Sequence, residues 1–176
     1  MKILKPSFSI LMLLVLATSC KKNDFLDENV PTETAAATAP DLSLDTDSSA
    51  WYSSSKWDIA AQDDFSVHYI NVSDDKITAD VVDNGLVLVF KQNSAGIAAL
   101  PLEEGGKAES QYWYHQVTEG NLLISADTYG AAKAPDASST FKYFILTSQT
   151  LKTLEGNGYT LDRLMGLSYQ EASELL

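Results

Sequence analysis

The sequence is poor in the residues that most catalytic and metal sites require. Its 176 residues include one cysteine, two histidines, and 12 basic residues against 24 acidic ones. Because Cys20 is alone, no intramolecular disulfide can form. The formal net charge of −12 disfavours contact with phosphate backbones, so we expect no nucleic-acid partner. His68 and His115 each stand alone in a strand pattern, without a second ligand at metal spacing, and are expected to be packed or solvated strand residues.

Motifs of catalytic chemistry are absent from the sequence as well. It contains no nucleophile elbow, phosphate-binding loop, dinucleotide fingerprint or zinc-binding helix. The many carboxylates cluster in expected turns, where acidic residues are usually only solvated. We therefore expect no enzymatic activity, no cofactor and no metal. A small hydrolase stays an alternative, because the two carboxylates of a glycosidase are defined by their spacing in the fold.

An apolar run near the N-terminus is typical of an export signal. Lysines precede an apolar segment from Phe8 to Ala17, and small residues lead from there to Cys20. This layout predicts a signal peptide over residues 1–19, cleaved between Ser19 and Cys20. The apolar run is shorter than the roughly 20 residues that a membrane-spanning helix needs. The alternatives are an ordinary secretory signal peptide and an uncleaved membrane anchor.

The residues before Cys20 resemble the lipobox of bacterial lipoproteins, with Ala17 where that motif usually has leucine. The resemblance implies that Cys20 is the lipid-attachment site and becomes the mature N-terminus as a diacylglyceryl cysteine, with palmitate as a typical acyl group. A lone cysteine in an exported protein agrees with this, because it has no disulfide partner. Two acyl chains suffice for stable anchoring. The membrane is thus an expected partner, through the lipid anchor.

Residues 20–50 are predicted to be the lipidated N-terminus and a disordered acidic tether. No basic residue lies between Lys22 and Lys56, and the stretch 31–40 has only small or polar side chains. Such a segment buries too little apolar surface to offset an ordering entropy of about 1–2 kcal/mol per residue. Residues 21–28, two lysines followed by acids, resemble the surface-export signals of lipoproteins from the Bacteroidota. This implies a place on the outer membrane facing the cell surface, with a periplasm-facing orientation as the alternative.

Residues 51–176 are predicted to form one mainly β domain, which begins at Trp51. Short runs of apolar or alternating residues, bounded by turn residues, predict strands at 56–62, 65–72, 86–90, 97–102, 110–118, 121–127 and 140–148. The run 86–90 is apolar throughout, which predicts a central strand buried on both faces. Strands 110–118 and 121–127 should form a hairpin turning at Glu119 and Gly120. Within 65–72 the alternation changes phase at Ile70, as at a β-bulge.

Two regions have helical signals. Thr78 and Gly85 bracket a short helix before the central strand, with Thr78 as N-cap and Gly85 as a left-handed end. Near the C-terminus, residues 160–165 and a capping box from Ser168 to Glu171 predict short helical turns. Together the signals predict a mainly β fold: an antiparallel β-sandwich or open barrel with one short helix before the central strand and a short C-terminal helix.

Four stretches of the domain are distinctive together: Trp57, the run 76–90, the pair Leu100-Pro101, and residues 141–146. They resemble a family of Bacteroidota lipoproteins with a small β-sandwich domain. The resemblance covers roughly residues 57–154. It implies a β-sandwich on a lipid tether and brings no catalytic residues with it.

The sequence Tyr112-Trp113-Tyr114-His115 is a candidate for binding. In a strand, Tyr112 and Tyr114 point to one side while Trp113 and His115 point to the other. Exposed aromatic side chains on a sheet can stack against sugar rings, so Tyr112, Trp113 and Tyr114 are a candidate ligand face. The alternative, which we favour, is that Trp113 anchors the core and the tyrosines are ordinary strand residues.

The function predicted from these features is that of an envelope-anchored lipoprotein whose domain is a non-catalytic binding or structural module. A glycan-binding module that uses the aromatic strand face is the alternative. The expected partners besides the membrane are a cell-surface glycan or an envelope protein.

Overall fold

The computed structural model describes residue 44 and residues 46–62, 65–106, 109–129 and 134–176. Residues 41–176 group into one compact unit. The predicted signal peptide, the cleavage and lipid-attachment residues Ser19 and Cys20, and the tether up to residue 43 lie outside the described residues. Among the described residues, no helix has the length and apolar character that crossing a membrane requires.

The described strands form two five-stranded antiparallel sheets, here called sheet A and sheet B. Sheet A has the order β1-β10-β5-β6, with β2 also paired to β10. Its strands are β1 (Thr46–Ser48), β2 (Tyr52–Ser53), β5 (Leu86–Asn93), β6 (Gly96–Ala99) and β10 (Thr140–Leu146). Sheet B has the order β3-β4-β9-β8-β7. Its strands are β3 (Asp58–Gln62), β4 (Phe65–Ser73), β7 (Leu102–Gly106), β8 (Glu109–Thr118) and β9 (Asn121–Tyr129).

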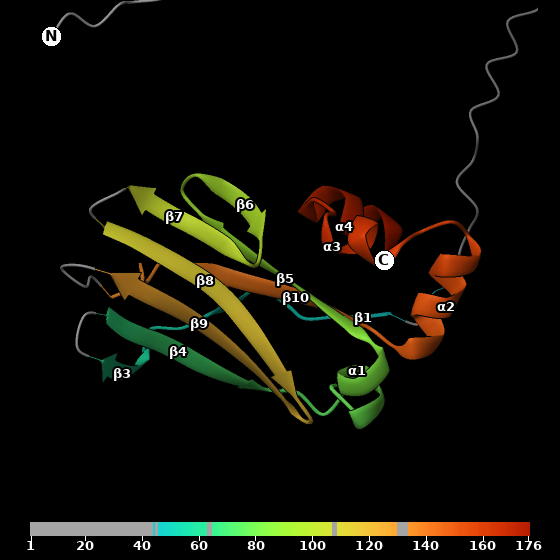
Figure 1. Cartoon of the computed structure of the whole chain (residues 1–176), viewed down its shortest axis with the longest axis horizontal. Coiled ribbons are helices and arrows are strands. Elements are labelled where there is room, and N and C mark those ends of the chain that lie inside the picture. Colours follow the sequence, from blue (N-terminus) through green and yellow to red (C-terminus); the bar gives the residue numbers. More distant parts are fainter. Residues whose placement is uncertain (1–43, 45, 63–64, 107–108, 130–133) are drawn as a thin grey trace, which may run out of the picture. The chain divides into compact units, whose positions relative to one another are not determined.

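The two sheets pack face to face, and helices add a third layer on sheet A (Figure 1). One apolar cluster fills the space between the sheets and includes Trp113, Ile124 and Phe141. A second cluster lies between the other face of sheet A and the C-terminal helices α2 (Ser148–Gly156), α3 (Leu161–Met165) and α4 (Tyr169–Leu175). Of the two predicted architectures, the sandwich is the one observed.

The position of β5 between two apolar layers explains its uninterrupted hydrophobic run. Val87 and Val89 belong to the cluster between the sheets, whereas Leu88 and Phe90 belong to the cluster under the helices. Because successive side chains of a strand point to opposite faces, a strand covered on both sides must be apolar at every position. The predicted central strand with two buried faces is confirmed.

Helix α1 (Ala79–Asn84) precedes β5 as predicted, and Thr78 is its N-cap. The predicted left-handed end at Gly85 is wrong, because Gly85 has φ −100°. Glycine is required there for space instead. A Cβ on Gly85 would lie 2.6 Å from the carbonyl oxygen of Leu146 and 2.7 Å from the Cα of Val81, both backbone atoms.

Three parts of the prediction differ from the structure. The range 97–102, predicted as one strand, contains most of β6 of sheet A and the start of β7 of sheet B. β1 lies inside the range predicted as tether and pairs with β10 from Thr46↔Leu146 to Ser48↔Phe144, so the ordered domain begins before Trp51. The last strand ends at Leu146, and the helix α2 follows with Thr147 as its N-cap. This helix was not predicted. The other C-terminal signals are confirmed, including the capping box of Ser168.

The C-terminal end of α4 also contacts the first strand. The Thr46 hydroxyl donates a hydrogen bond to the Leu176 carbonyl oxygen at 2.6 Å. The first described strand is therefore held by β10 on one side and by the end of the chain.

Candidate functional site

The side of sheet B that faces away from sheet A is not covered by any described helix. The buried apolar residues of α2, α3 and α4 pack on sheet A, and Val81 of α1 packs between the sheets. Directly paired residues of antiparallel strands point to the same side, so the register assigns the side chains of this surface. This surface is called here the outer face of sheet B. It includes Phe65, Val67, Tyr69 and Asn71 on β4, Asp127, Ser125 and Leu123 on β9, Tyr112, Tyr114 and Gln116 on β8, Glu103 on β7 and Asp58 on β3.

The three residues of the predicted ligand face divide between the two sides of sheet B. Trp113 is fully buried between the sheets, with its ring centroid 5.6 Å from that of Trp57 and 5.7 Å from that of Phe141. It is therefore a core anchor and is not available to a ligand. Tyr112 and Tyr114 lie on the outer face of sheet B. Tyr112 is 43% exposed, and Tyr114 is half-buried.

The rings of Tyr112 and Tyr114 form one aromatic surface. Their centroids are 5.9 Å apart and their planes differ by 27°. The Tyr114 hydroxyl donates a hydrogen bond to Asp127 Oδ1 at 3.2 Å. This bond holds the Asp127 carboxylate on the same face as the two rings.

A third tyrosine extends this surface. Tyr69 on β4 pairs with Ser125 on β9, which pairs with Tyr114 on β8. Ser125 is 1% exposed. Its small side chain therefore sits below the level of the two tyrosines that flank it in the register.

Sequence reasoning missed Tyr69 because it interpreted β4 as a bulged strand. The pairing of β4 with β9 is continuous from Phe65↔Tyr129 to Ser73↔Asn121, without a bulge. The phase change arises because β4 has apolar residues on both faces. Ile70 and Val72 pack in the core between the sheets, while Phe65, Val67 and Tyr69 point outward and are half-buried. Apolar residues on the exposed side of a strand were the signal available for this face.

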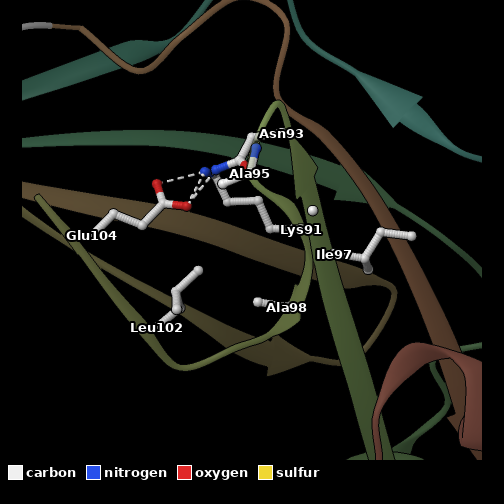
Figure 2. A pocket seen from close by; sticks show the side chains of 8 residues that line it. Lys91, Asn93, Ala95, Ile97, Ala98, Leu102 and Glu104 are labelled. Carbon is white, nitrogen blue, oxygen red and sulfur yellow. Dashed lines mark hydrogen bonds and ion pairs between the residues drawn. The ribbon is translucent and has the colours of Figure 1, made fainter.

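A pocket of about 230 Å³ lies elsewhere, between the edge strands β6 and β7 (Figure 2). Its polar wall is a buried ion pair: Lys91 Nζ lies 2.7 Å and 2.6 Å from the two carboxylate oxygens of Glu104. Asn93 Nδ2 donates to Glu104 Oε1 at 2.6 Å, and the Lys91 ammonium lies 4.4 Å from the centroid of the Trp113 ring.

Figure 2 shows the ammonium of Lys91 directed at Glu104, with Ile97 and Leu102 on the walls of the pocket. Lys91 is 3% exposed. Because its charge is already matched by a carboxylate and a ring face, this pocket offers a ligand mainly apolar walls. It is the weaker of the two candidate sites.

Both histidines point into the sandwich. His68 is 4% exposed, and His115 lies on the same inner side as Trp113. Burial lowers the pKa of each below its ordinary value, and a hydrogen bond to the Val87 backbone partly opposes the shift at His115. Within the part of the chain that the structure describes, no group of three or more His, Cys, Asp or Glu residues could hold a metal ion.

Comparison with known proteins yields no relative. No protein-family model matches the sequence, and no curated protein or solved structure matches it. The outer face of sheet B and the N-terminal sequence are therefore the features of the chain that bear on its function.

Proposed function

We propose that this chain is an envelope lipoprotein whose domain is a non-catalytic module that binds a glycan on the outer face of sheet B. The observation that supports this most directly is the set of three tyrosines, Tyr69, Tyr112 and Tyr114, on a sheet face that no described helix covers. Tyr112 is exposed and the other two are half-buried, and an aromatic surface left open to solvent is a common sign of a binding surface.

The chemistry of this face suits a sugar chain. Pyranose rings have apolar C–H faces that stack on aromatic rings, and their hydroxyls need hydrogen-bond partners nearby. Asp127, Gln116 and Asn71 lie on the same face as the tyrosines. A sheet surface is open along its strands, so it can accept several units of a polymer.

The proposed anchor supports the same function. A lipid on Cys20, followed by a tether of about 25 residues, would hold the module at the membrane and leave it free to reach polymers of the cell envelope. The anchor is tested by labelling cells with a radioactive or clickable palmitate analogue. The label should enter the full chain and be lost in Cys20→Ala. Protease added to intact cells should degrade the protein if it faces the cell surface and should spare it if it faces the periplasm.

The binding function is tested with the full chain purified in detergent, by affinity electrophoresis and calorimetry against a panel of soluble polysaccharides. Tyr112→Ala should weaken binding about three- to tenfold, the effect of losing about 0.5–1.5 kcal/mol of aromatic stacking. Tyr52→Ala is the matched control, because Tyr52 is 37% exposed but lies in sheet A. Equal loss in both variants, or no retention of any polysaccharide by the wild type, would contradict the proposal.

A structural or assembly role is the second candidate. It is favoured by Ile59, which is 60% exposed on the edge strand β3. An exposed edge with an apolar side chain is a place where another protein chain can add a strand. This role predicts a co-purifying envelope protein that is lost in Ile59→Lys and kept in Tyr112→Ala.

A further inference from the structure

The exposed ring of Tyr112 lies between two carboxylates. In the sheet register, Tyr112 pairs with Glu103 of β7 on one side and with Asp127 of β9 on the other. Side chains paired in this way have Cβ atoms about 4.5–5.5 Å apart. Glu103 is exposed, and the bond from the Tyr114 hydroxyl fixes Asp127 on this face.

No positive side chain balances these acids among the described residues of the outer face. The charged residues that the register places there are Asp58, Glu103 and Asp127, all acidic. The chain as a whole has a formal net charge of −12. A ligand that stacks on Tyr112 therefore meets a negative potential.

We propose that the glycan bound on this face carries free amino groups, and that Tyr112, Glu103 and Asp127 recognise its ammonium substituents. The inference rests on the proposed function, since it names the class of sugar that the same face prefers. An ammonium group on a ring that stacks against Tyr112 lies within reach of a carboxylate on either side. It also gains attraction from the aromatic face itself.

The same arrangement rejects acidic sugars. A polyuronate places a carboxylate on every unit, and like charges at an exposed surface repel each other at short range. A neutral sugar gains stacking and hydroxyl hydrogen bonds but no ionic attraction. The expected order of affinity is amino sugar, then neutral sugar, then uronate.

The test compares three β-1,4-linked hexamers of equal length: a glucosamine hexamer, cellohexaose and a glucuronate hexamer. Binding to the full chain in detergent is measured by calorimetry at slightly acidic pH, in about 0.05 M and about 0.3 M salt, which screens exposed charges. At low salt the glucosamine hexamer should bind about three- to tenfold more tightly than cellohexaose, as expected for two exposed ion pairs. At high salt the difference should shrink.

Variants of the carboxylates and of Tyr112 distinguish the contribution of the charges to binding from that of the aromatic ring. Glu103→Gln with Asp127→Asn should abolish the preference for glucosamine, so that this variant binds the glucosamine hexamer and cellohexaose with affinities within about twofold of each other. Asp83→Asn with Glu155→Gln removes the same charge from the exposed surface of α1 and α2 and should keep the preference. Tyr112→Ala should weaken both sugars.

The outcomes distinguish the two proposals. Equal binding of glucosamine and cellohexaose hexamers, or tighter binding of the glucuronate hexamer, would overturn the preference for amino sugars while the glycan-binding function stands. A preference that persists in the Glu103 and Asp127 variant would overturn the assignment of those residues. If no hexamer binds, both proposals fail.

Discussion

The Tyr143 hydroxyl donates a hydrogen bond to Asp74 Oδ2 at 2.6 Å and so joins the two sheets of the sandwich. Tyr143 is on β10 of sheet A, and Asp74 lies in the turn that follows β4 of sheet B. Burial is the main cause that raises the pKa of Tyr143 above its ordinary value, and the bond to Asp74 and its charge add to the effect.

This relationship predicts a loss of stability in alkali. Tyr143 keeps its proton in the folded state, whereas in the unfolded chain it ionises near pH 10. Above that pH the unfolded state releases a proton that the folded state retains, so the free energy of unfolding decreases as pH rises. Urea unfolding at pH 8 and at about pH 10.5 should show a smaller decrease in Tyr143→Phe than in the wild type. Tyr159→Phe serves as the control, and equal slopes in all three proteins would disprove this origin.

The buried pair of Lys91 and Glu104 should be asymmetric under mutation. Glu104→Gln leaves the Lys91 ammonium inside the sandwich without a counter-charge. Breaking a buried ion pair in this way typically costs about 3–5 kcal/mol. We expect the lower end of that range, because 26% of the Glu104 side chain is exposed.

The double variant Lys91→Met with Glu104→Leu removes both charges. It should be more stable than Glu104→Gln alone, because no unpaired charge is left behind. Equilibrium urea unfolding at neutral pH measures all three free energies. A double variant less stable than the single one would show that the pair contributes net stability.

Gly85→Ala should destabilise the domain by about 1–3 kcal/mol, the usual cost of overpacking. The added methyl group would meet two backbone groups at under 3 Å, and backbone cannot move aside as a flexible side chain can. Gly156→Ala at the end of α2 is the matched control, since a Cβ there meets nothing within 4 Å. Melting temperatures that fall in Gly85→Ala and hold or rise in Gly156→Ala would agree with this prediction.

Acid should weaken the fold through its histidines. Burial lowers the pKa of His68 and of His115 from the ordinary value of 6.5. Below about pH 6.5 the unfolded chain therefore binds protons that the folded chain does not, and the free energy of unfolding falls as pH decreases. His68→Leu should reduce the difference in stability between pH 7 and pH 5. An unchanged difference would mean that other groups cause the acid sensitivity.

Much of the fold could be predicted because its signals are local. The apolar run of β5, the turn at Gly120 and the caps at Thr78 and Ser168 each depend on a few neighbouring residues. Such features follow from backbone preferences and side-chain hydrogen bonds within one segment.

The two missed elements, β1 and α2, have different causes. β1 is three residues of Thr, Asp and Ser, a composition that predicts a loop, and it is a strand only because β10 supplies its hydrogen bonds. For α2, the cap at Thr147 and the spacing of Leu151 and Leu154 were available signals. They were obscured by the strong strand that runs up to Leu146.

The candidate site was only partly predictable for a similar reason. Alternation separates Tyr112 and Tyr114 from Trp113, but it does not say which of the two sides is buried. Only the second sheet decides this, through the contacts of Trp113 with Phe141. The neighbours of Tyr112, namely Glu103 and Asp127, follow from a register that no single segment encodes.

The pairing of β1 with β10 and the bond from Thr46 to Leu176 constrain the order in which the domain can fold. Residues 46–48 pair with residues about 100 positions later in the sequence, and the Thr46 hydroxyl donates to a residue 130 positions away. Contacts of such long range slow folding, because the loop between them must close first. Sheet A therefore cannot be completed until β10, which is its last strand in sequence and lies between β1 and β5, has been synthesised.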